Sequence, residues 1–339
     1  MDKNDMDQAD GPSSDAAGAP DVFQRTDFSG LNEVVEKIKA QFSTVIVGQD
    51  AVIELLITAI LADGHVLIEG VPGVAKTLMA KTLARTLDTG FSRIQFTPDL
   101  MPSDVLGTSV FHPAKTQFEF RKGPIFSNII LIDEINRAPA KTQAALFEVM
   151  EERQVTNDGI TYPMDVPFLV AATQNPIEQE GTYRLPEAQL DRFLFKILVP
   201  YPSLEEEIRI LANHHQALNP ADDIAPVISA AAIAEARGKV RQVHVEPKLM
   251  EYLAKLVTGT RNNPFLFLGA SPRASVALLN ASKALAAIRG RDFITPEDIQ
   301  ELAVPVLCHR IQLTAEREME GHAVEGVIKQ IVQKLEVPR

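Results

Sequence analysis

The sequence predicts an α/β fold with a parallel sheet, followed by a smaller helical domain. Five short apolar runs alternate with helical segments up to about residue 200, which is the pattern of strands joined by helical crossovers. Beyond residue 201, the apolar residues recur only at helical spacing. A chain of 339 residues is long enough to give each of two such domains its own core.

The N-terminal segment differs from the rest of the chain. Residues 1–27 combine repeated aspartates with glycine, alanine, serine and proline, and they contain almost nothing apolar. This composition predicts a disordered acidic tail, and the segment lacks the apolar core of a signal peptide. Helical periodicity starts at Leu31, and a loop at 46–49 separates this helix from a second one that ends before the first strand.

The predicted elements divide the chain near residue 200. We predict an α/β domain over residues 28–200 and a helical domain over residues 201–339. The last helix of the second group begins with Thr295 as its N-cap, followed by a proline and, two positions later, an acidic residue. The strands are expected at 65–69, 91–96, 129–132, 167–172 and 193–199. The helices of the second domain are expected at 203–217, 228–240, 246–260, 272–289 and 296–304.

Composition limits the kinds of protein that this chain can be. A formal net charge of −12 argues against a protein that coats nucleic acid or an anionic membrane. The single cysteine, Cys308, allows no internal disulfide and fits a reducing cytoplasm. The longest apolar stretch contains charged residues, so the sequence predicts no membrane span. We therefore expect a cytoplasmic protein that neither binds nucleic acid nor inserts into a membrane.

The stretch EGVPGVAKTLMAK, residues 69–81, nearly matches a phosphate-binding loop. Gly70, Lys76 and Thr77 occupy signature positions, whereas Ala75 stands where the pattern has a second glycine. Such a loop needs backbone N–H groups aimed at the phosphates, a lysine for the β- and γ-phosphates and a hydroxyl that can ligate Mg²⁺. Alanine is compatible with this role at a negative φ, and we expect that conformation at Ala75.

The alternative interpretation is a glycine-proline turn that precedes a lysine by coincidence. The apolar run HVLIEG at 65–70 predicts a buried strand that enters the turn, and residues 76–87 have the spacing of a helix that leaves it. A strand, a glycine turn and a helix N-terminus form the setting that phosphate binding requires. This context favours the phosphate loop.

Two acidic residues end the run IILIDE at 129–134. A carboxylate at the carboxyl end of a strand beside a phosphate loop can hold Mg²⁺, and the next one can polarise the attacking water. Asp133 fits the first role and Glu134 the second. The alternative is a solvated strand end, and the phosphate loop upstream favours the functional interpretation.

Two further polar residues could act at the same site. Asn175 follows an apolar run in FLVAATQNP, where it either starts a turn or hydrogen-bonds the γ-phosphate or the lytic water. Arg192 precedes the last strand, in LPEAQLDRF. It forms either a surface salt bridge with Asp191 or Glu187, or an arginine finger that reaches the phosphates of a neighbouring subunit. The spacing alone leaves both roles open.

These motifs, in this order, resemble those of the AAA+ ATPases and, in finer detail, those of the MoxR family. The segments that carry the resemblance are GVPGVAKT at 70–77, RIQFTPDLMPSDVLG at 93–107 and GPIFSNIILIDEINRAPAKTQAALFEVMEE at 123–152. In the first of these segments, alanine precedes the lysine, and members of this family tend to have the same residue there. The resemblance covers about residues 30–335 and implies a P-loop AAA+ domain with a five-stranded parallel sheet, followed by a small all-α lid domain.

The resemblance also implies site residues by position. Thr77 and Asp133 would be the Mg²⁺ ligands. Arg273, in the motif GASPRAS, would face the γ-phosphate from the lid of the same subunit. The catalytic residues that it implies are Glu134, the sensor asparagine Asn175 and the trans-acting Arg192. Its nucleotide contacts are Gly48 and Gln49 near the adenine, and Gly70, Val71, Pro72, Gly73, Val74, Ala75, Lys76, Thr77, Leu78 and Arg273.

Two insertions in the α/β domain belong to the same resemblance. Residues 100–124 look like an insert after the second strand, and an Asn-Asp-Gly turn within residues 154–166 predicts a β-hairpin on its own. Both would face the centre of a ring or its partners. Outside these motifs, Phe265, Phe267 and Leu268 are expected to pack the two domains together.

The family resemblance implies an ATP hydrolase that uses ATP and Mg²⁺, forms a homo-hexameric ring and remodels or matures a protein client. A client with a von Willebrand A domain would be a separate chain, because this one has no D-x-S-x-S run. Three alternatives stay open: the ATPase subunit of a metal chelatase, a ring-shaped nucleic-acid motor, and a binding module that uses nucleotide as a slow switch. The net charge of −12 argues against the nucleic-acid motor.

Overall fold

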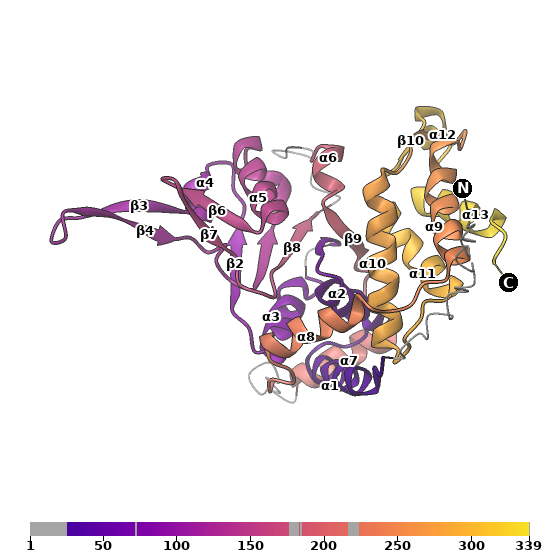
Figure 1. Ribbon diagram of the computed structural model, residues 1–339, viewed down its shortest axis with the longest axis horizontal. Coiled ribbons are helices and arrows are strands. Elements are labelled where there is room, and N and C mark those ends of the chain that lie inside the picture. The colour runs from indigo at the N-terminus through magenta and orange to yellow at the C-terminus, as the bar shows by residue number, and fades with distance from the viewer. Residues whose placement is uncertain (1–25, 72, 176–182, 184, 216–223, 339) are drawn as a thin grey trace, which may run out of the picture.

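The computed structural model describes residues 26–71, 73–175, 183, 185–215 and 224–338. The predicted acidic tail lies outside these residues except for its last two positions, and so does Pro72. In Figure 1, the sheet and its hairpins occupy the left and centre, and the last helices of the chain lie on the right.

A parallel sheet forms the centre of the α/β domain. Its five strands run in the order β2-β5-β8-β1-β9, and each neighbouring pair is parallel. They coincide with the predicted strands to within two residues, which confirms the predicted sheet. β5 is buried along its whole length, as expected of a parallel strand covered on both faces. The strands are β1 (His65–Glu69), β2 (Phe91–Gln95), β5 (Ile129–Asp133), β8 (Leu169–Gln174) and β9 (Phe193–Leu198).

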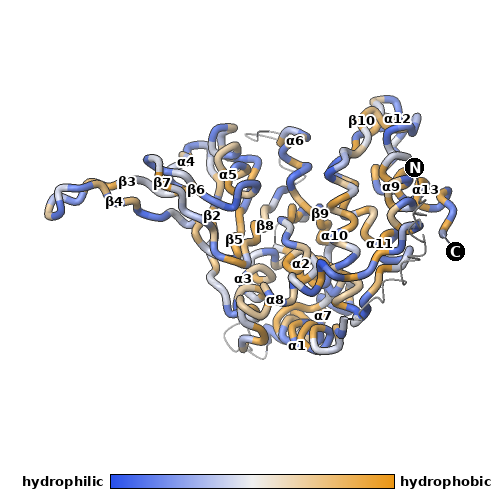
Figure 2. The backbone as a smooth tube through the Cα atoms, in the orientation of Figure 1, coloured by the Kyte–Doolittle hydropathy of each residue, from blue (hydrophilic) through white to orange (hydrophobic). Residues whose placement is uncertain are grey.

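Helices cover both faces of this sheet, because successive side chains of a strand point to opposite faces. Ile129 and Leu131 of β5 belong to one hydrophobic core, and Ile130 and Ile132 belong to the other. Figure 2 shows that the most hydrophobic parts of the chain are the central strands and the helices packed on them. The first face is covered by α1 (Ser29–Val45), α2 (Asp50–Leu61) and α3 (Lys76–Thr86), and the second by α4 (Pro102–Leu106) and α5 (Ala140–Glu152).

Two β-hairpins extend from the second layer. Strands β3 (Gly107–His112) and β4 (Gln117–Lys122) form a long hairpin within the expected insert, and it projects from the body of the molecule in Figure 1. Strands β6 (Gln154–Asn157) and β7 (Ile160–Pro163) form a second, shorter hairpin.

The shorter hairpin supports the longer one. Its turn residues Asp158 and Gly159 both have positive φ, at 50° and 77°, as a two-residue type I′ turn requires. Asn157 Nδ2 donates to Ser109 Oγ of β3 at 2.7 Å. The two hairpins are therefore hydrogen-bonded to each other near the base of the projection.

Helices dominate the rest of the chain, and the described part holds no helix that is both long and apolar enough to cross a bilayer. The sequence missed one feature, since β10 (Leu266–Leu268) and β11 (Gln312–Leu313) form a small antiparallel sheet. These strands are too short to show an alternating pattern. Thr295 and Asp298 form the expected capping box. The helices are α7 (Leu204–His215), α8 (Ala230–Val240), α9 (Pro247–Arg261), α10 (Pro272–Ile288), α11 (Pro296–Leu307), α12 (Ala315–Met319) and α13 (Val324–Lys334).

The expected packing of Phe267 between the two domains is wrong. Phe267 is 78% exposed and Leu268 is 39% exposed. Phe265 stacks on the ring of His322 within the lid, with ring centroids 5.8 Å apart. Strand β10 pairs with β11 at the upper right of Figure 1, and Leu268 lines a cavity that it shares with Glu69 and Gln174 of the central sheet.

One hydrophobic core instead continues from helices α1 to α3 into helices α8 to α11. Arg310 is the polar anchor of this junction and is only 7% exposed. Its Nε donates to Asp191 Oδ1 at 2.8 Å, and its Nη1 donates to the backbone carbonyl of Leu194 at 3.1 Å. Burial lowers the pKa of the Arg310 guanidinium, and Asp191 opposes that shift. The pair therefore ties the end of α11 to the start of β9.

We predict that Arg310→Met lowers the free energy of unfolding by about 3–5 kcal/mol, because Asp191 would keep its charge at this junction without its partner. Equilibrium urea unfolding measures the change. The control is Lys255→Met, which removes only an exposed ion pair with Glu251 and should leave the midpoint nearly unchanged. A loss no larger than that of the control would contradict the anchoring role of Arg310.

Candidate functional site

The predicted phosphate loop joins β1 to α3, at the carboxyl end of a central strand. Gly70 is buried, and a Cβ atom there would lie 2.9 Å from the backbone carbonyl oxygen of Val199, so the position requires glycine. Gly73 has φ +89°, a conformation that favours glycine. Its missing side chain leaves open space, with nothing within 4 Å of a Cβ at that position. The loop is therefore shaped for close approach of another group to its backbone.

Ala75 corrects one expectation about this loop. Its φ is 57° and its ψ is 22°, in the left-handed region, so the predicted negative φ is wrong. Ala75 is the N-cap of α3, and its carbonyl oxygen accepts the first helical bond from Met79 N at 2.9 Å. The loop therefore keeps the backbone of a glycine at a position occupied by alanine, at a cost of roughly 1–2 kcal/mol.

Lys76 and Thr77 begin α3 immediately after this turn. Lys76 Nζ donates to the carbonyl oxygen of Gly70 at 2.7 Å, so the lysine side chain folds back across the loop. Val74 and Leu78 are partly buried against the adjoining hydrophobic core and hold the loop to the body of the domain. The N–H groups of the first helical turn have no partners within the helix itself, which makes this end of α3 suited to an anion.

Asp133 and Glu134 lie at the same edge of the sheet. Asp133 is the last residue of β5 and is only 8% exposed. Its Oδ2 accepts a bond from Arg93 Nε at 2.6 Å, and its Oδ1 accepts one from Thr173 Oγ1 at 3.2 Å. The same Thr173 oxygen accepts from the backbone N–H of Glu134 at 3.1 Å. Thr173 on β8 therefore orients both acidic residues.

The Glu134 carboxylate is held by two further side chains. Its Oε2 accepts a bond from Gln95 Nε2 at 2.7 Å and lies 3.2 Å from Arg137 Nε. Glu134 itself has φ 56°, at the start of the short 3₁₀ helix η1 (Ile135–Arg137). Gln95 is the last residue of β2, and it lies beside Asp133 in the register of the two strands. These contacts fix the direction of the carboxylate.

Asn175 completes this edge. It directly follows β8, whose last residue Gln174 lies beside Glu69 at the end of β1. The parallel sheet thus brings together the phosphate loop, the two acidic residues and Asn175, which the sequence separates by up to about a hundred positions.

Gly48 and Gln49 lie in the loop between α1 and α2, and this loop contacts the segment that joins β9 to α7. Both have positive φ, at 72° and 68°, and Gln49 Nε2 donates to the carbonyl oxygen of Pro200 at 3.2 Å. Gln49 Oε1 is buried and has no hydrogen-bond partner among the described atoms. A Cβ atom on Gly48 would lie 2.1 Å from Glu206 Oε1, which is the end of a flexible side chain, so it is the positive φ that favours glycine here.

Arg192 lies at the opposite edge of the sheet. It precedes Phe193, the first residue of β9, which pairs with His65 at the start of β1. Arg192 Nη1 donates to the carbonyl oxygen of Phe147 at 2.6 Å and lies 3.9 Å from Glu151 Oε2. Of the two partners expected for a surface salt bridge, Asp191 pairs with Arg310 instead.

Arg273 corrects a second expectation. Its Nη2 donates to Glu151 Oε1 at 2.9 Å, near the C-terminal end of α5. This end of α5 lies at the amino-terminal edge of the sheet, because Met150 O accepts a bond from the ring of His65 at 3.1 Å. The four residue steps of β1 alone separate the two edges by about 13 Å. In this structure Arg273 therefore does not face the phosphate loop of its own chain, and it shares Glu151 with Arg192.

The residues of this site fit a magnesium nucleotide. In the described ranges, no three histidine, cysteine, aspartate or glutamate side chains gather into a metal cage. Mg²⁺ bound with a nucleotide needs no such cage, because it takes one or two protein ligands, the phosphates and water. Thr77 and Asp133 supply a hydroxyl and a carboxylate of the required kind.

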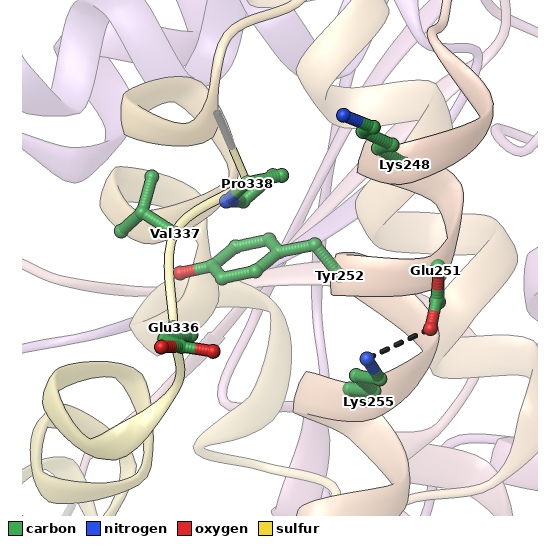
Figure 3. Close-up of a pocket in the computed structure, with 7 residues that line it drawn as sticks. All are labelled: Lys248, Glu251, Tyr252, Lys255, Glu336, Val337 and Pro338. Atoms are coloured by element: carbon green, nitrogen blue, oxygen red, sulfur yellow. Dashed lines mark ion pairs between the residues drawn. The ribbon is translucent and has the colours of Figure 1, made fainter.

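A separate cavity of about 900 Å³ lies on the lid, between α9 and the C-terminal segment. Figure 3 shows Tyr252 reaching across it towards Glu336 and Val337, with the Lys255–Glu251 ion pair at its rim. None of the predicted site residues lines this cavity. Its size alone does not make it part of the nucleotide chemistry.

Known proteins resemble this chain over most of its length. The ATPase family associated with various cellular activities (AAA) matches residues 65–195, and the AAA lid domain matches residues 258–331. The chain is 45% identical to uncharacterized protein YeaC of Bacillus subtilis, over 91% of this chain and 96% of that protein. It is 43% identical to chaperone MoxR1 of Mycobacterium tuberculosis, over 90% of this chain and 82% of that protein. A crystal structure of a candidate ATPase from Cytophaga hutchinsonii is 42% identical, with a TM-score of 0.86 over 92% of this chain and 97% of its own.

We predict that Ala75→Gly raises the free energy of unfolding by about 0.5–1 kcal/mol, because glycine adopts the left-handed conformation without the Cβ penalty. Urea unfolding of the whole chain measures it. The matched control is Ala40→Gly, in the exposed interior of α1, which should lower stability by about 0.5–1 kcal/mol. Destabilisation by both substitutions would contradict the left-handed turn at Ala75.

Proposed function

Because the chain belongs to the MoxR family of AAA+ ATPases, we propose that it hydrolyses ATP in a homo-hexameric ring and thereby remodels a protein client. Family membership supports ATP hydrolysis in general. The name of the relative MoxR1, a chaperone, supports a protein client. The geometry of the site supports the ring.

The observation that supports the proposed ring is the separation of Arg192 and Arg273 from the phosphate loop. Arg192 and Arg273 lie at the amino-terminal edge of the sheet, and the loop lies at the carboxyl edge. In a closed head-to-tail ring, one edge of each subunit faces the opposite edge of the next. We therefore extend the trans-acting role proposed for Arg192 to Arg273.

The loop and the start of α3 would hold the phosphates, through backbone N–H groups and the Lys76 ammonium. Gln49 Oε1 is the buried acceptor that an adenine amino group needs. Thr77 and Asp133 would hold Mg²⁺, which when bound offsets the negative charge of the phosphates. Arg93 now neutralises Asp133, so the carboxylate exchanges one positive partner for another when the metal nucleotide enters.

Glu134 would accept the proton of the attacking water, and Asn175 would orient that water or the terminal phosphate. Gln95 and Arg137 both hold the Glu134 carboxylate through the same oxygen, Oε2, so the other oxygen, Oε1, would accept the proton. Gln95 and Arg137 thus act as positioning residues that set the resting direction of the base. The neighbour's Arg192 and Arg273 would stabilise the charge on the transferred phosphoryl group.

The projecting hairpin is the surface that we propose for the client. Phe111 and Phe118 lie on opposite strands beside its tip, with ring centroids 5.3 Å apart. They are 47% and 71% exposed, although aromatic side chains of this size are usually covered. A separate protein with a von Willebrand A domain is the client class that the family resemblance suggests, and the cytoplasm is the compartment.

The alternatives predict different measurements. A metal-chelatase subunit would couple ATP turnover to metal insertion into a ring-shaped ligand, and a nucleic-acid motor would bind single strands in a salt-dependent manner. A slow nucleotide switch would assemble with its client on binding ATP and would need Glu134 little for that assembly. Steady-state turnover with and without a client separates the switch from the remodelling ATPase.

We predict that Glu134→Gln binds ATP as the unaltered protein does but lowers turnover by ~10²-fold or more, because the base is lost while Asp133 remains. Lys76→Ala should instead abolish tight binding, since no other lysine or arginine lies on the described part of the loop. Calorimetry measures binding, and phosphate release measures turnover. Equal loss of binding in both variants would show that the roles of the two acidic residues are assigned wrongly.

We predict that two inactive variants regain activity when their subunits mix. Arg192→Ala keeps its own pocket, and Lys76→Ala still offers its arginines to a neighbour, so their shared interface is complete. A finger of this kind is worth ~10³-fold or more in rate, so recovery should be clear and should peak near equal proportions. Arg273→Ala mixed with Lys76→Ala should behave in the same way, whereas a contact within one subunit allows no recovery.

Two control mixtures complete this experiment. Lys76→Ala with Glu134→Gln damages the same pocket in both subunits, and Arg192→Ala with Arg273→Ala damages the same arginine face. Neither mixture should recover, because every interface then lacks one essential group. With subunit exchange shown by fluorescence energy transfer, failure of the main mixtures would overturn the trans assignment.

A further inference from the structure

A second cavity, of about 230 Å³, lies where the turn between α2 and β1 meets helices α8 and α10. Its polar lining consists of Asp63 from the turn, Arg237 and Arg241 from the end of α8, and Asn280 and Lys283 from α10. Asp63 precedes β1, so this cavity lies at the amino-terminal edge of the sheet, away from the phosphate loop. It is therefore distinct from the nucleotide site.

The single carboxylate in this lining is already neutralised. Asp63 Oδ1 lies 2.8 Å from Arg237 Nη1 and 3.2 Å from Arg153 Nη2. Arg237 is itself fixed, since its Nε donates to the carbonyl oxygen of Ile60 at 2.7 Å and the residue is 6% exposed. Asp63 thus has no charge left to offer to further cations.

Two cations in the lining have no carboxylate partner among the described residues. Lys283 Nζ donates to the backbone oxygen of Arg241 at 2.9 Å and makes no ion pair in this part of the chain. Burial lowers the pKa of Lys283, and no acidic group opposes that shift. The charge of Arg241 also lowers the pKa of Arg237, so the cations here repel one another. An anion would relieve this repulsion.

We propose that this cavity binds a phosphate group. Arg241, Lys283 and Asn280 come from the end of one helix and from a second helix, and all three line this cavity. A phosphate offers several acceptor oxygens in a tetrahedral arrangement, so it can accept from all three donors, whereas a carboxylate offers two coplanar oxygens. Guanidinium and ammonium groups are the usual partners of phosphate in proteins.

Such a site would join helices α8 and α10 beside the turn that precedes β1. Arg241 ends α8, Asn280 and Lys283 lie on α10, and α10 also carries Arg273 at its start. A bound phosphate would draw α8 and α10 together through Arg241 and Lys283. It would thereby help to hold α10 in its position next to α5, where Arg273 donates a hydrogen bond to Glu151.

The test uses the full chain with Lys76→Ala, so that phosphate does not bind at the phosphate loop. Calorimetric titration with inorganic phosphate, at constant ionic strength, should show one saturable site per chain. Lys283→Gln and Arg241→Gln should each weaken binding by roughly tenfold or more, because each removes a charge-assisted hydrogen bond. Asn280→Ala should weaken it by a smaller factor, because its amide is neutral.

The matched control is Lys329→Gln, which removes one exposed positive charge from α13 and should leave the affinity unchanged. Lys283→Arg keeps the charge and should retain most of the binding, which separates loss of the donor from loss of the fold. A parallel titration with AMP identifies the source: binding of both ligands indicates a site open to phosphate esters, and binding of inorganic phosphate alone indicates a closed one. Absence of saturable binding, or equal weakening by Lys329→Gln, would overturn the proposal.

Discussion

All five strands of the central sheet run in the same direction, and this parallel order decides where each chemical group of the protein can lie. The segments that follow the strands gather at one edge, which therefore holds the phosphate loop, Asp133, Glu134 and Asn175. The segments that precede the strands gather at the other edge, where Arg192 enters β9. Helix α5 crosses one face from the first edge to the second. The sheet therefore holds Arg192 at the edge opposite its own phosphate loop, so the trans-acting role proposed for Arg192 needs a second copy of the chain.

The sequence predicted what depends on near neighbours in the chain. Asp133 and Glu134 were recognisable because they end a buried strand, and all five strands were recognisable as apolar runs of the right length. Arg93 and Gln95 were not, because they touch these acids across 40 and 39 residues of sequence. Their role depends on β2 lying next to β5, and the sequence of neither strand predicts which strands are neighbours in the sheet. The only sequence signal for this role is that Arg93 and Gln95 occupy alternate positions of one strand. Solvated edge strands commonly carry the same pattern of polar residues, so the signal is weak.

The two errors at the site have different physical origins. Alanine is uncommon in the left-handed region, so its presence argued for a negative φ at residue 75, but the strand and helix on either side of the turn impose the left-handed conformation. The position of Arg273 depends on how one domain docks on another. Ser271 Oγ donates to Asp191 Oδ2 at 2.9 Å, so the start of α10 is held beside β9 and α5. An arginine at a helix start does not specify which surface of another domain the helix will meet.

Glu151 gives this arrangement a further consequence in the proposed ring. One carboxylate holds two guanidinium groups, with Arg273 at 2.9 Å and Arg192 at 3.9 Å. The phosphates of a neighbour carry more charge than this carboxylate, so they compete for both arginines at once. Glu151 belongs to α5, which begins three residues after Arg137, and Arg137 pairs with Glu134 of the same chain. In the proposed ring, a change in the contacts of the arginines at one end of α5 would act on a helix whose other end adjoins Glu134, the proposed base. Neighbouring sites in the proposed ring would thus be coupled through a single helix, without a movement of the sheet itself.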